Sequence, residues 1–269
     1  MQLNQIRKGS GNYLVLVHGA LTDGAMWLPH MAYLAAHFEV VSISLRHFER
    51  PEEGSFGLNS HADDLGKVIS ALLEEKPVSV VAWSYGADVV LNMLAKQAMP
   101  LAKVFLYEPG YPGCVKEEAM GAWLEDANAI FGAVFEHFGH GHLEQAVEAL
   151  IDGTGNRPGY FQAQPDDVKA LQLSKAFTLA QQLHQQEQPQ LDPQRVAQIE
   201  TPIILGHGSA TRDMFKLVTR HTAATSERFQ LLEAAGQGHM LPQADPEAFS
   251  RMVVEALAAP AQEGCKAPI

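Results

Sequence analysis

The chain has 269 residues, of which 46% are hydrophobic and 19% are charged. This is enough apolar material for one large α/β domain or for one domain that carries an insertion. The 31 acidic residues outnumber the 19 basic ones, for a formal net charge of −12. Because no cluster of Lys and Arg reverses this charge locally, nucleic-acid binding is excluded as a leading function.

The cysteines and the apolar runs bear on the cellular compartment. Cys114 and Cys265 lie far apart in the sequence, and two isolated cysteines form neither a disulfide framework nor a metal site. The first residues lack the apolar stretch of a secretion signal, and no apolar run reaches the length of a membrane-spanning helix. We therefore expect a cytoplasmic protein that has no membrane partner.

Short β-branched runs alternate with longer amphipathic stretches along the chain, which is typical of a mostly parallel sheet flanked by helices. The runs predicted as strands are Tyr13–Val17, Glu39–Ser44, Val78–Trp83, Lys103–Glu108, Pro202–Gly206 and Phe229–Glu233, with Leu3–Arg7 as a candidate edge strand. Between them, apolar residues recur at helical spacing in Met26–His37, His61–Glu75 and Ala87–Gln97.

This alternation stops between Pro112 and Glu200, where only helical patterns occur. The predicted helices are Trp123–Phe138, Leu143–Asp152, Pro165–Leu173 and Phe177–Gln186. A helical block that is entered after one strand and left before the next is typical of a lid over the strand ends. The predicted division is a core of residues 1–111 and 201–259, a lid of residues 112–200 and a tail of residues 260–269.

The strand-to-helix junction around Ser84 carries the strongest chemical signal. An apolar strand, Val78–Trp83, runs into Ser84, and an amphipathic helix follows at once. A serine on such a turn is held exposed in strained backbone geometry, and small residues are needed two positions before and after it. Gly86 fits the usual G-x-S-x-G pattern, whereas Ala82 replaces its first glycine. Ser84 is the candidate nucleophile, and the alternative reading is a helix N-cap.

A serine hydroxyl is a poor nucleophile unless a neighbouring base takes its proton. His239, one of twelve histidines, lies in a Gly-rich loop directly after the last predicted strand, and the next helix begins at Asp245 and Pro246. This places His239 at the same end of the sheet as Ser84. His239 is therefore the candidate base.

Acyl transfer also needs backbone N–H groups that point at the developing oxyanion. One candidate is the N–H of Tyr85, the residue after the nucleophile. The other is the N–H of Ala20, in the loop after the strand that ends in His18-Gly19. We interpret His18 as a structural residue that fixes this loop.

The chain resembles the α/β-hydrolase superfamily, in its esterase-like branch with a helical lid. Four segments carry the resemblance: the His-Gly loop at His18, the strand-to-helix turn at Ser84 (the elbow), the helical block, and the final Gly-His loop at His239. The resemblance covers nearly the whole chain. It implies a mostly parallel α/β-hydrolase sheet flanked by helices, with a helical lid inserted after the sixth strand. It also implies hydrolysis of a small ester, thioester, lactone or C–C bond through an acyl-Ser84 intermediate.

The scaffold leaves other activities open, because function depends on the pocket and not on the fold. One alternative is a cofactor-free lyase, perhydrolase or acyltransferase. Another is a non-catalytic sensor that binds a ligand under its lid.

The acid that orients His239 is where this chain departs from the commoner family pattern. The usual acid follows the next-to-last strand in a Gly-x-x-Asp turn, but here Ser209 stands in place of the aspartate, and a hydroxyl does not stabilise an imidazolium as a carboxylate does. Glu108 follows the strand after the elbow, where haloalkane dehalogenases place their acid. We predict Glu108, with Asp213 as the alternative acid. A purely structural carboxylate at the lid hinge is the other reading of Glu108.

No cofactor or metal is expected. Neither common type of Gly-rich phosphate loop is present, and His137, His140 and His142 lack a Cys or carboxylate at ligand spacing. The aromatic residues of the predicted lid helix recur at helical spacing and favour a substrate with an apolar or aromatic part. These residues are Trp123, Phe131, Phe135 and Phe138.

Overall fold

Seven hydrogen-bonded strands, in the order β1-β3-β2-β4-β5-β6-β7, form a twisted sheet in the computed structural model, which describes residues 3–258. β1 pairs antiparallel with β3, and the other neighbouring pairs are parallel. The mostly parallel sheet predicted from the sequence is confirmed, and the candidate edge strand is part of it. The strands are β1 (Gln5–Gly9), β2 (Tyr13–Val17), β3 (Glu39–Ile43), β4 (Val78–Trp83), β5 (Lys103–Tyr107), β6 (Ile203–Gly208) and β7 (Phe229–Ala234).

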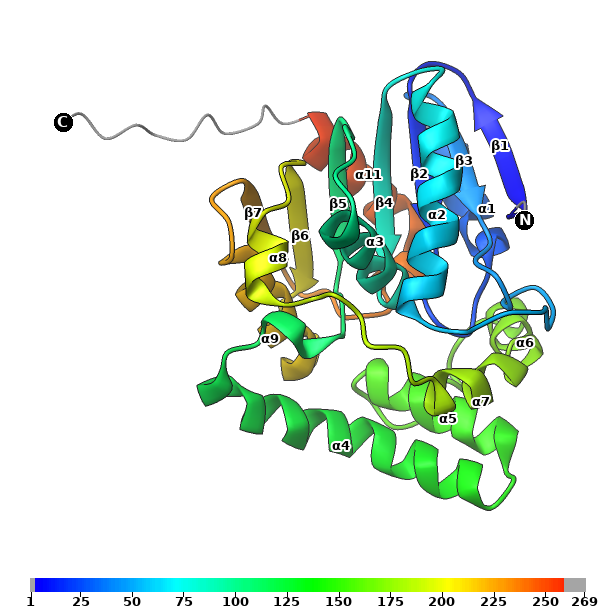
Figure 1. Cartoon of the computed structure of the whole chain (residues 1–269). Helices are drawn as coiled ribbons and strands as arrows, with labels where there is room; N and C mark the ends of the chain where they lie inside the picture. The colour runs from blue at the N-terminus through cyan, green and yellow to red at the C-terminus, as the bar shows by residue number, and fades with distance from the viewer. Residues whose placement is uncertain (1–2, 259–269) are drawn as a thin grey trace.

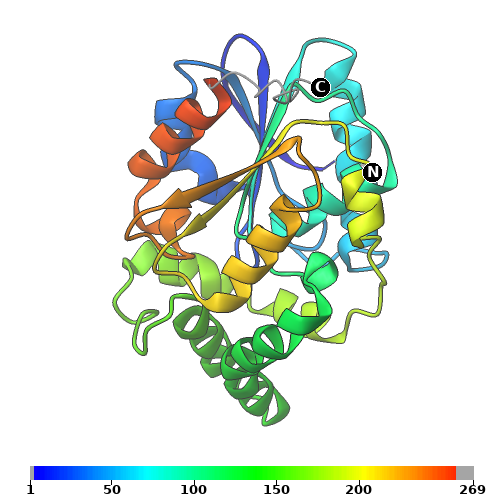
Figure 2. The same ribbon diagram turned by 90° about the vertical axis from the view of Figure 1, so that its left-hand side faces the viewer.

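Helices cover both faces of the sheet (Figures 1 and 2). Because successive side chains of a strand point to opposite faces, β2 contributes Val15 to the core under one helix layer and Leu16 to the core under the other. Burial on both faces explains the nearly continuous apolar strands. One face is covered by α2 (Leu58–Leu73) and α3 (Tyr85–Lys96), and the other by α1 (Leu28–Leu34) and α11 (Pro246–Ala258).

The segment between β5 and β6 consists of helices joined by turns and loops, and residues 112–200 contain no strand. Its longest helices lie beyond one end of the sheet (Figure 1), whereas α8 packs against α3. The segment follows the fifth strand of the described chain, not the sixth as the resemblance implied, because only four strands precede β5. Its helices are η2 (Pro112–Cys114), α4 (Glu117–Gly139), α5 (Leu143–Thr154), α6 (Asp166–Ser174), α7 (Phe177–His184) and α8 (Pro193–Ala197).

Parallel strands bring their carboxyl ends to one edge of the sheet, and the loops after β2, β4, β5 and β7 meet there. Three further helices follow strands of the sheet. They are η1 (Gly24–Trp27) after β2, α9 (Asp213–Ala223) after β6 and α10 (Leu241–Ala244) after β7. No helix within residues 3–258 is both long and apolar enough to span a bilayer. The predicted tail, residues 260–269, lies outside the described residues.

Candidate active site

Ser84 occupies the sharp turn between β4 and α3, with a φ of 54° and a ψ of −125°. A positive φ is costly for a residue that has a Cβ atom, so the surrounding structure must hold the turn. It does so from both sides of the residue. The Ser84 N–H donates to the Tyr107 carbonyl at 2.9 Å, and the Ser84 carbonyl accepts from the Ala87 N–H at 2.8 Å.

The small residues around this turn are required by a close approach of backbone segments. A Cβ atom at Gly86 would lie 2.3 Å from the His18 carbonyl oxygen, so no other residue fits there without a shift. Ala82, two residues before Ser84, is fully buried in the core without such a conflict. The departure from G-x-S-x-G at this position is therefore sterically compatible with the elbow.

Ser84, His239 and Glu108 form a continuous chain of hydrogen bonds. His239 Nδ1 lies 2.7 Å from Glu108 Oε2, and His239 Nε2 lies 3.1 Å from Ser84 Oγ. Because an ionised carboxylate only accepts hydrogen bonds, Nδ1 carries the proton and Nε2 is free to accept from the serine hydroxyl. Glu108 is wholly buried and His239 is 3% exposed, so little water competes for these bonds.

Glu108 has further partners that hold its carboxylate in place. Oε1 accepts from the Gly208 N–H at 2.7 Å, and Oε2 also accepts from the Thr211 hydroxyl at 2.7 Å. Its own backbone, with a φ of 51°, is positioned by donation of the Glu108 N–H to the Gly206 carbonyl at 2.9 Å. The carboxylate therefore accepts an N–H from the end of β6, and not from the lid hinge as the structural alternative expected, and it also contacts His239.

The other candidate acid lies elsewhere. Asp213 is at the start of α9, where its mostly exposed carboxylate contacts Lys216 at 3.4 Å. The neighbouring Arg212 pairs with Asp126 and not with Asp213. Ser209, which stands where the family's aspartate usually is, accepts the Gly236 N–H at 2.8 Å and so braces the loop that leads to His239.

Three aromatic residues that the sequence did not single out position the His239 loop. The Phe215 ring stacks on the imidazole, with ring centres 3.9 Å apart and an angle of 10° between the planes. The Trp83 indole N–H donates to the His239 carbonyl at 2.9 Å, and the Tyr107 hydroxyl donates to the Gly238 carbonyl at 2.9 Å. Trp83 and Tyr107 end the strands before Ser84 and Glu108, which is the only sequence signal for them.

His18 fixes the loop after β2, as expected. Its Nδ1–H donates to the Gly19 carbonyl at 2.8 Å, and its Nε2 accepts the Leu45 N–H at 3.0 Å. Burial lowers the pKa of His18 to about 4, so the ring is neutral and can accept that bond near neutral pH. Ala20, in this loop, and Tyr85 both line the cavity that contains Ser84.

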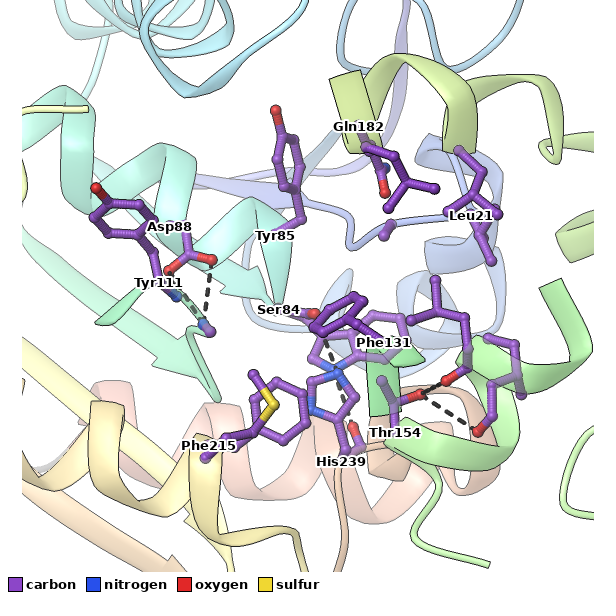
Figure 3. Close-up of a pocket in the computed structure, with 18 of the residues that line it drawn as sticks. Leu21, Ser84, Tyr85, Asp88, Tyr111, Phe131, Thr154, Gln182, Phe215 and His239 are labelled. Carbon is purple, nitrogen blue, oxygen red and sulfur yellow. Dashed lines mark hydrogen bonds between the residues drawn. The ribbon is translucent and has the colours of Figure 1, made fainter. Parts of the chain in front are cut away.

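The cavity at the strand ends has a volume of about 430 Å³ and is lined by Ser84, His239 and residues of α4, α5 and α7. Figure 3 shows Phe131, Thr154 and Gln182 of these helices around the two catalytic candidates. Trp123 and Phe131 of the predicted aromatic stripe line the cavity, whereas Phe135 is 54% exposed. Most of the lining is apolar, as the pattern on α4 indicated. It includes Leu21, Trp83, Leu150, Ile151, Leu179 and Met240.

Asp88 is the one carboxyl group among the lining residues of this cavity. It lies one turn after Ser84 on α3 and accepts the backbone N–H groups of Gly110 and Tyr111 at 3.1 Å (Figure 3). Burial raises the pKa of Asp88 to about 7, although these two hydrogen bonds act in the opposite direction. Within residues 3–258 no group of three or more His, Cys, Asp or Glu side chains is arranged to hold a metal ion.

A sequence profile of the Alpha/beta hydrolase family matches residues 14–252. Two relatives are both named pimeloyl-[acyl-carrier protein] methyl ester esterase. The one from Vibrio cholerae is 27% identical over 166 residues, which are 56% of this chain and 62% of the relative. The one from Vibrio campbellii is 30% identical over 176 residues, 60% of this chain and 65% of the relative. The matched region spans less than two thirds of either relative.

Solved structures resemble the whole described chain. MenH from S. aureus superposes with a TM-score of 0.74 at 18% identity and covers 95% of this chain and 97% of its own. The thermophilic esterase from Thermogutta terrifontis has a TM-score of 0.71 at 21% identity, with coverage of 95% and 92%. The enol-lactonase from Burkholderia xenovorans LB400 has a TM-score of 0.70 at 18% identity and covers 96% of both chains. At these identities the likeness shows a common fold.

Proposed function

Because this chain belongs to the alpha/beta hydrolase family, we propose that it hydrolyses a small ester, thioester, lactone or C–C bond substrate through an acyl intermediate on Ser84. The observation that carries this proposal is the hydrogen-bonded chain from Ser84 through His239 to Glu108. The names of the similar proteins, which include methyl ester esterases and an enol-lactonase, favour an ester or lactone bond.

The first half of the proposed reaction transfers the acyl group to the enzyme. Ser84 Oγ attacks the carbonyl carbon while its proton passes to His239 Nε2, and Glu108 stabilises the imidazolium through Nδ1–H. The N–H groups of Ala20 and Tyr85 are proposed to bind the oxyanion. The intermediate then collapses, and the leaving alcohol or thiol takes the proton from Nε2.

The second half releases the acyl group by the same route. Water gives a proton to His239 Nε2 and attacks the acyl carbon, and the carboxylic acid product leaves as Ser84 Oγ regains its proton. Two features support this scheme. The apolar cavity provides space for an apolar acyl or alcohol part. The burial of Glu108 and His239 keeps water away from the pair and so strengthens the interaction of the carboxylate with the imidazolium.

Two measurements on purified protein test the proposal. A fluorophosphonate probe should label the wild type and leave Ser84→Ala unlabelled, because only an activated serine reacts. Short p-nitrophenyl esters should be turned over many times by each enzyme molecule. Absence of labelling would contradict the nucleophile assignment, and labelling without turnover would favour a transferase or a ligand sensor on the same scaffold.

A further inference from the structure

The wall of the cavity formed by α4 and α7 contains polar atoms that the protein leaves unpaired. Trp123 Nε1, Gln182 Nε2 and Gln185 Oε1 are closed off from solvent and have no hydrogen-bond partner among the described residues. All three residues line the cavity above Ser84. Buried polar atoms are nearly always paired, since leaving one unpaired costs as much as a lost hydrogen bond. This wall therefore has hydrogen-bonding groups that a bound ligand could pair with.

Gln182 is the best placed of the three to contact a ligand. It lies in the last turns of α7, and Figure 3 shows its side chain extending from that helix toward the space above Ser84. The Nε2 atom of its carboxamide has no hydrogen-bond partner within the described residues. Because a rotation of the carboxamide exchanges its oxygen and nitrogen, Gln182 can present either a donor or an acceptor to the cavity.

The charge of the lining restricts what this wall can bind. No Lys or Arg is among the lining residues of the cavity, all of which belong to the described chain, and Asp88 is a carboxyl group in the same space. A carboxylate in the substrate would find no cation to pair with and would be desolvated at a large cost. The carboxyl group of Asp88 already accepts two backbone N–H groups, those of Gly110 and Tyr111.

We propose that Gln182 is a specificity-determining residue, and that the substrate carries, apart from the bond that is cleaved, an uncharged group that both donates and accepts hydrogen bonds, such as an amide or a hydroxyl. The inference rests on the proposed hydrolysis at Ser84 and names the substrate class for that site. The apolar remainder of the cavity holds the hydrocarbon part of the substrate between the two polar ends. A site built to pair a polar group discriminates against an analogue that lacks it.

The test compares esters that differ only at the end remote from the scissile bond. In one series the acyl chain of a p-nitrophenyl ester ends in a methyl, primary amide, carboxylate or ammonium group, and in a second series the same ends are placed on the alcohol part. We expect the amide-ended ester to have the highest kcat/KM in one of the two series. Replacing Gln182 by Met, which keeps the length but removes both hydrogen-bonding groups, should lower the ratio of amide-ended to methyl-ended kcat/KM by about tenfold.

Gln181→Met is the matched control. Gln181 is the neighbouring residue on α7 and also has an unpartnered buried atom, but it does not line the cavity. The specificity ratio should stay at the wild-type value in this variant. A ratio that is equal in wild type and Gln182→Met in both series would overturn the inference, as would a preference for the ammonium-ended ester, which would assign recognition to Asp88.

A binding measurement tests the Gln182 subsite independently of the proposed hydrolysis. In the Ser84→Ala background, where no acyl enzyme can form, calorimetric titration with the intact esters reports the cavity alone. The amide-ended ester should bind about tenfold more tightly than the methyl-ended one, and Gln182→Met should remove that difference. If the wild type did not turn over the esters although this binding difference was present, only the hydrolase proposal would be contradicted. If the wild type turned them over but no binding difference was found, only the subsite would be contradicted.

Discussion

Glu108 and His239 are 131 residues apart in the chain, yet a carboxylate oxygen of Glu108 lies 2.7 Å from Nδ1 of His239. The pair is buried, and its carboxylate is held by a backbone N–H and a hydroxyl, with no Lys or Arg paired to it among the described residues. Glu108 follows β5, and His239 follows β7, with β6 between the two strands. The contact therefore depends on the order of strands in the sheet.

Replacing the candidate acids one at a time separates Glu108 from Asp213. We expect Glu108→Gln to lower turnover by about 10²–10⁴-fold, because a neutral amide cannot stabilise the imidazolium or hold its tautomer. Asp213→Asn is the matched control and should change turnover little, since Asp213 contacts Lys216 on the exposed side of α9. Steady-state kinetics on a p-nitrophenyl ester measures both. The reverse ranking would refute the assignment of Glu108.

The nucleophile and the base are expected to act as one unit. Ser84→Ala and His239→Ala should each reduce turnover by roughly 10⁴-fold or more, and the double variant should lose little beyond either single one. Circular dichroism checks that each variant is folded. If Ser84→Ala kept more than a tenth of the wild-type turnover, the covalent route would be wrong.

The elbow should be intolerant of added volume on its helix side. In Gly86→Ala the new methyl group would lie 2.3 Å from the His18 carbonyl oxygen. We therefore expect the free energy of unfolding, measured by urea denaturation, to fall by about 1–3 kcal/mol. Gly121→Ala in α4 is the control, since nothing lies within 4 Å of the new methyl group there. That change should raise stability by about 0.5–1 kcal/mol, because alanine is the better helix residue. Equal effects at both positions would contradict the close approach.

Asp88 should make the protein less stable as the pH rises toward neutrality. Burial raises its pKa from the usual 3.8 to about 7, so between these values the folded chain holds a proton that the unfolded chain has released. Stability therefore falls with rising pH across this window and levels off above it. Asp88→Asn removes the ionisation.

The measurement compares the urea unfolding free energies of the wild type and Asp88→Asn in acid and alkaline buffer. The variant should gain stability relative to the wild type on going from about pH 5 to about pH 8, the range over which the folded-state carboxyl ionises. A difference that is independent of pH would show that burial does not hold the carboxyl protonated.

The strand runs, the helical block and the elbow were predictable because each depends on local order in the chain. Periodicity identified β4 and α3 on either side of Ser84, and the Gly-rich loop after the last strand singled out His239 from twelve histidines. The helical segment lies directly after β5, at the residues the sequence indicated, and only its ordinal number, which came from the resemblance, was one strand too high. Phe215 was missed, since nothing near it in sequence indicates that it stacks on the His239 ring.

The sequence by itself determined the fold class and the geometry around Ser84, because a strand, a sharp turn and a helix are set by residues that are neighbours in the chain. It left the acid open between Glu108 and Asp213, since both occur between Ser84 and His239. Only the tertiary structure decided which carboxylate reaches His239. The parallel sheet brings the ends of β5 and β7 to one edge, where the Gly208 N–H and the Thr211 hydroxyl hold Glu108, while α9 carries Asp213 to the surface. Contacts between distant segments depend on the packing of the sheet, which no local pattern encodes.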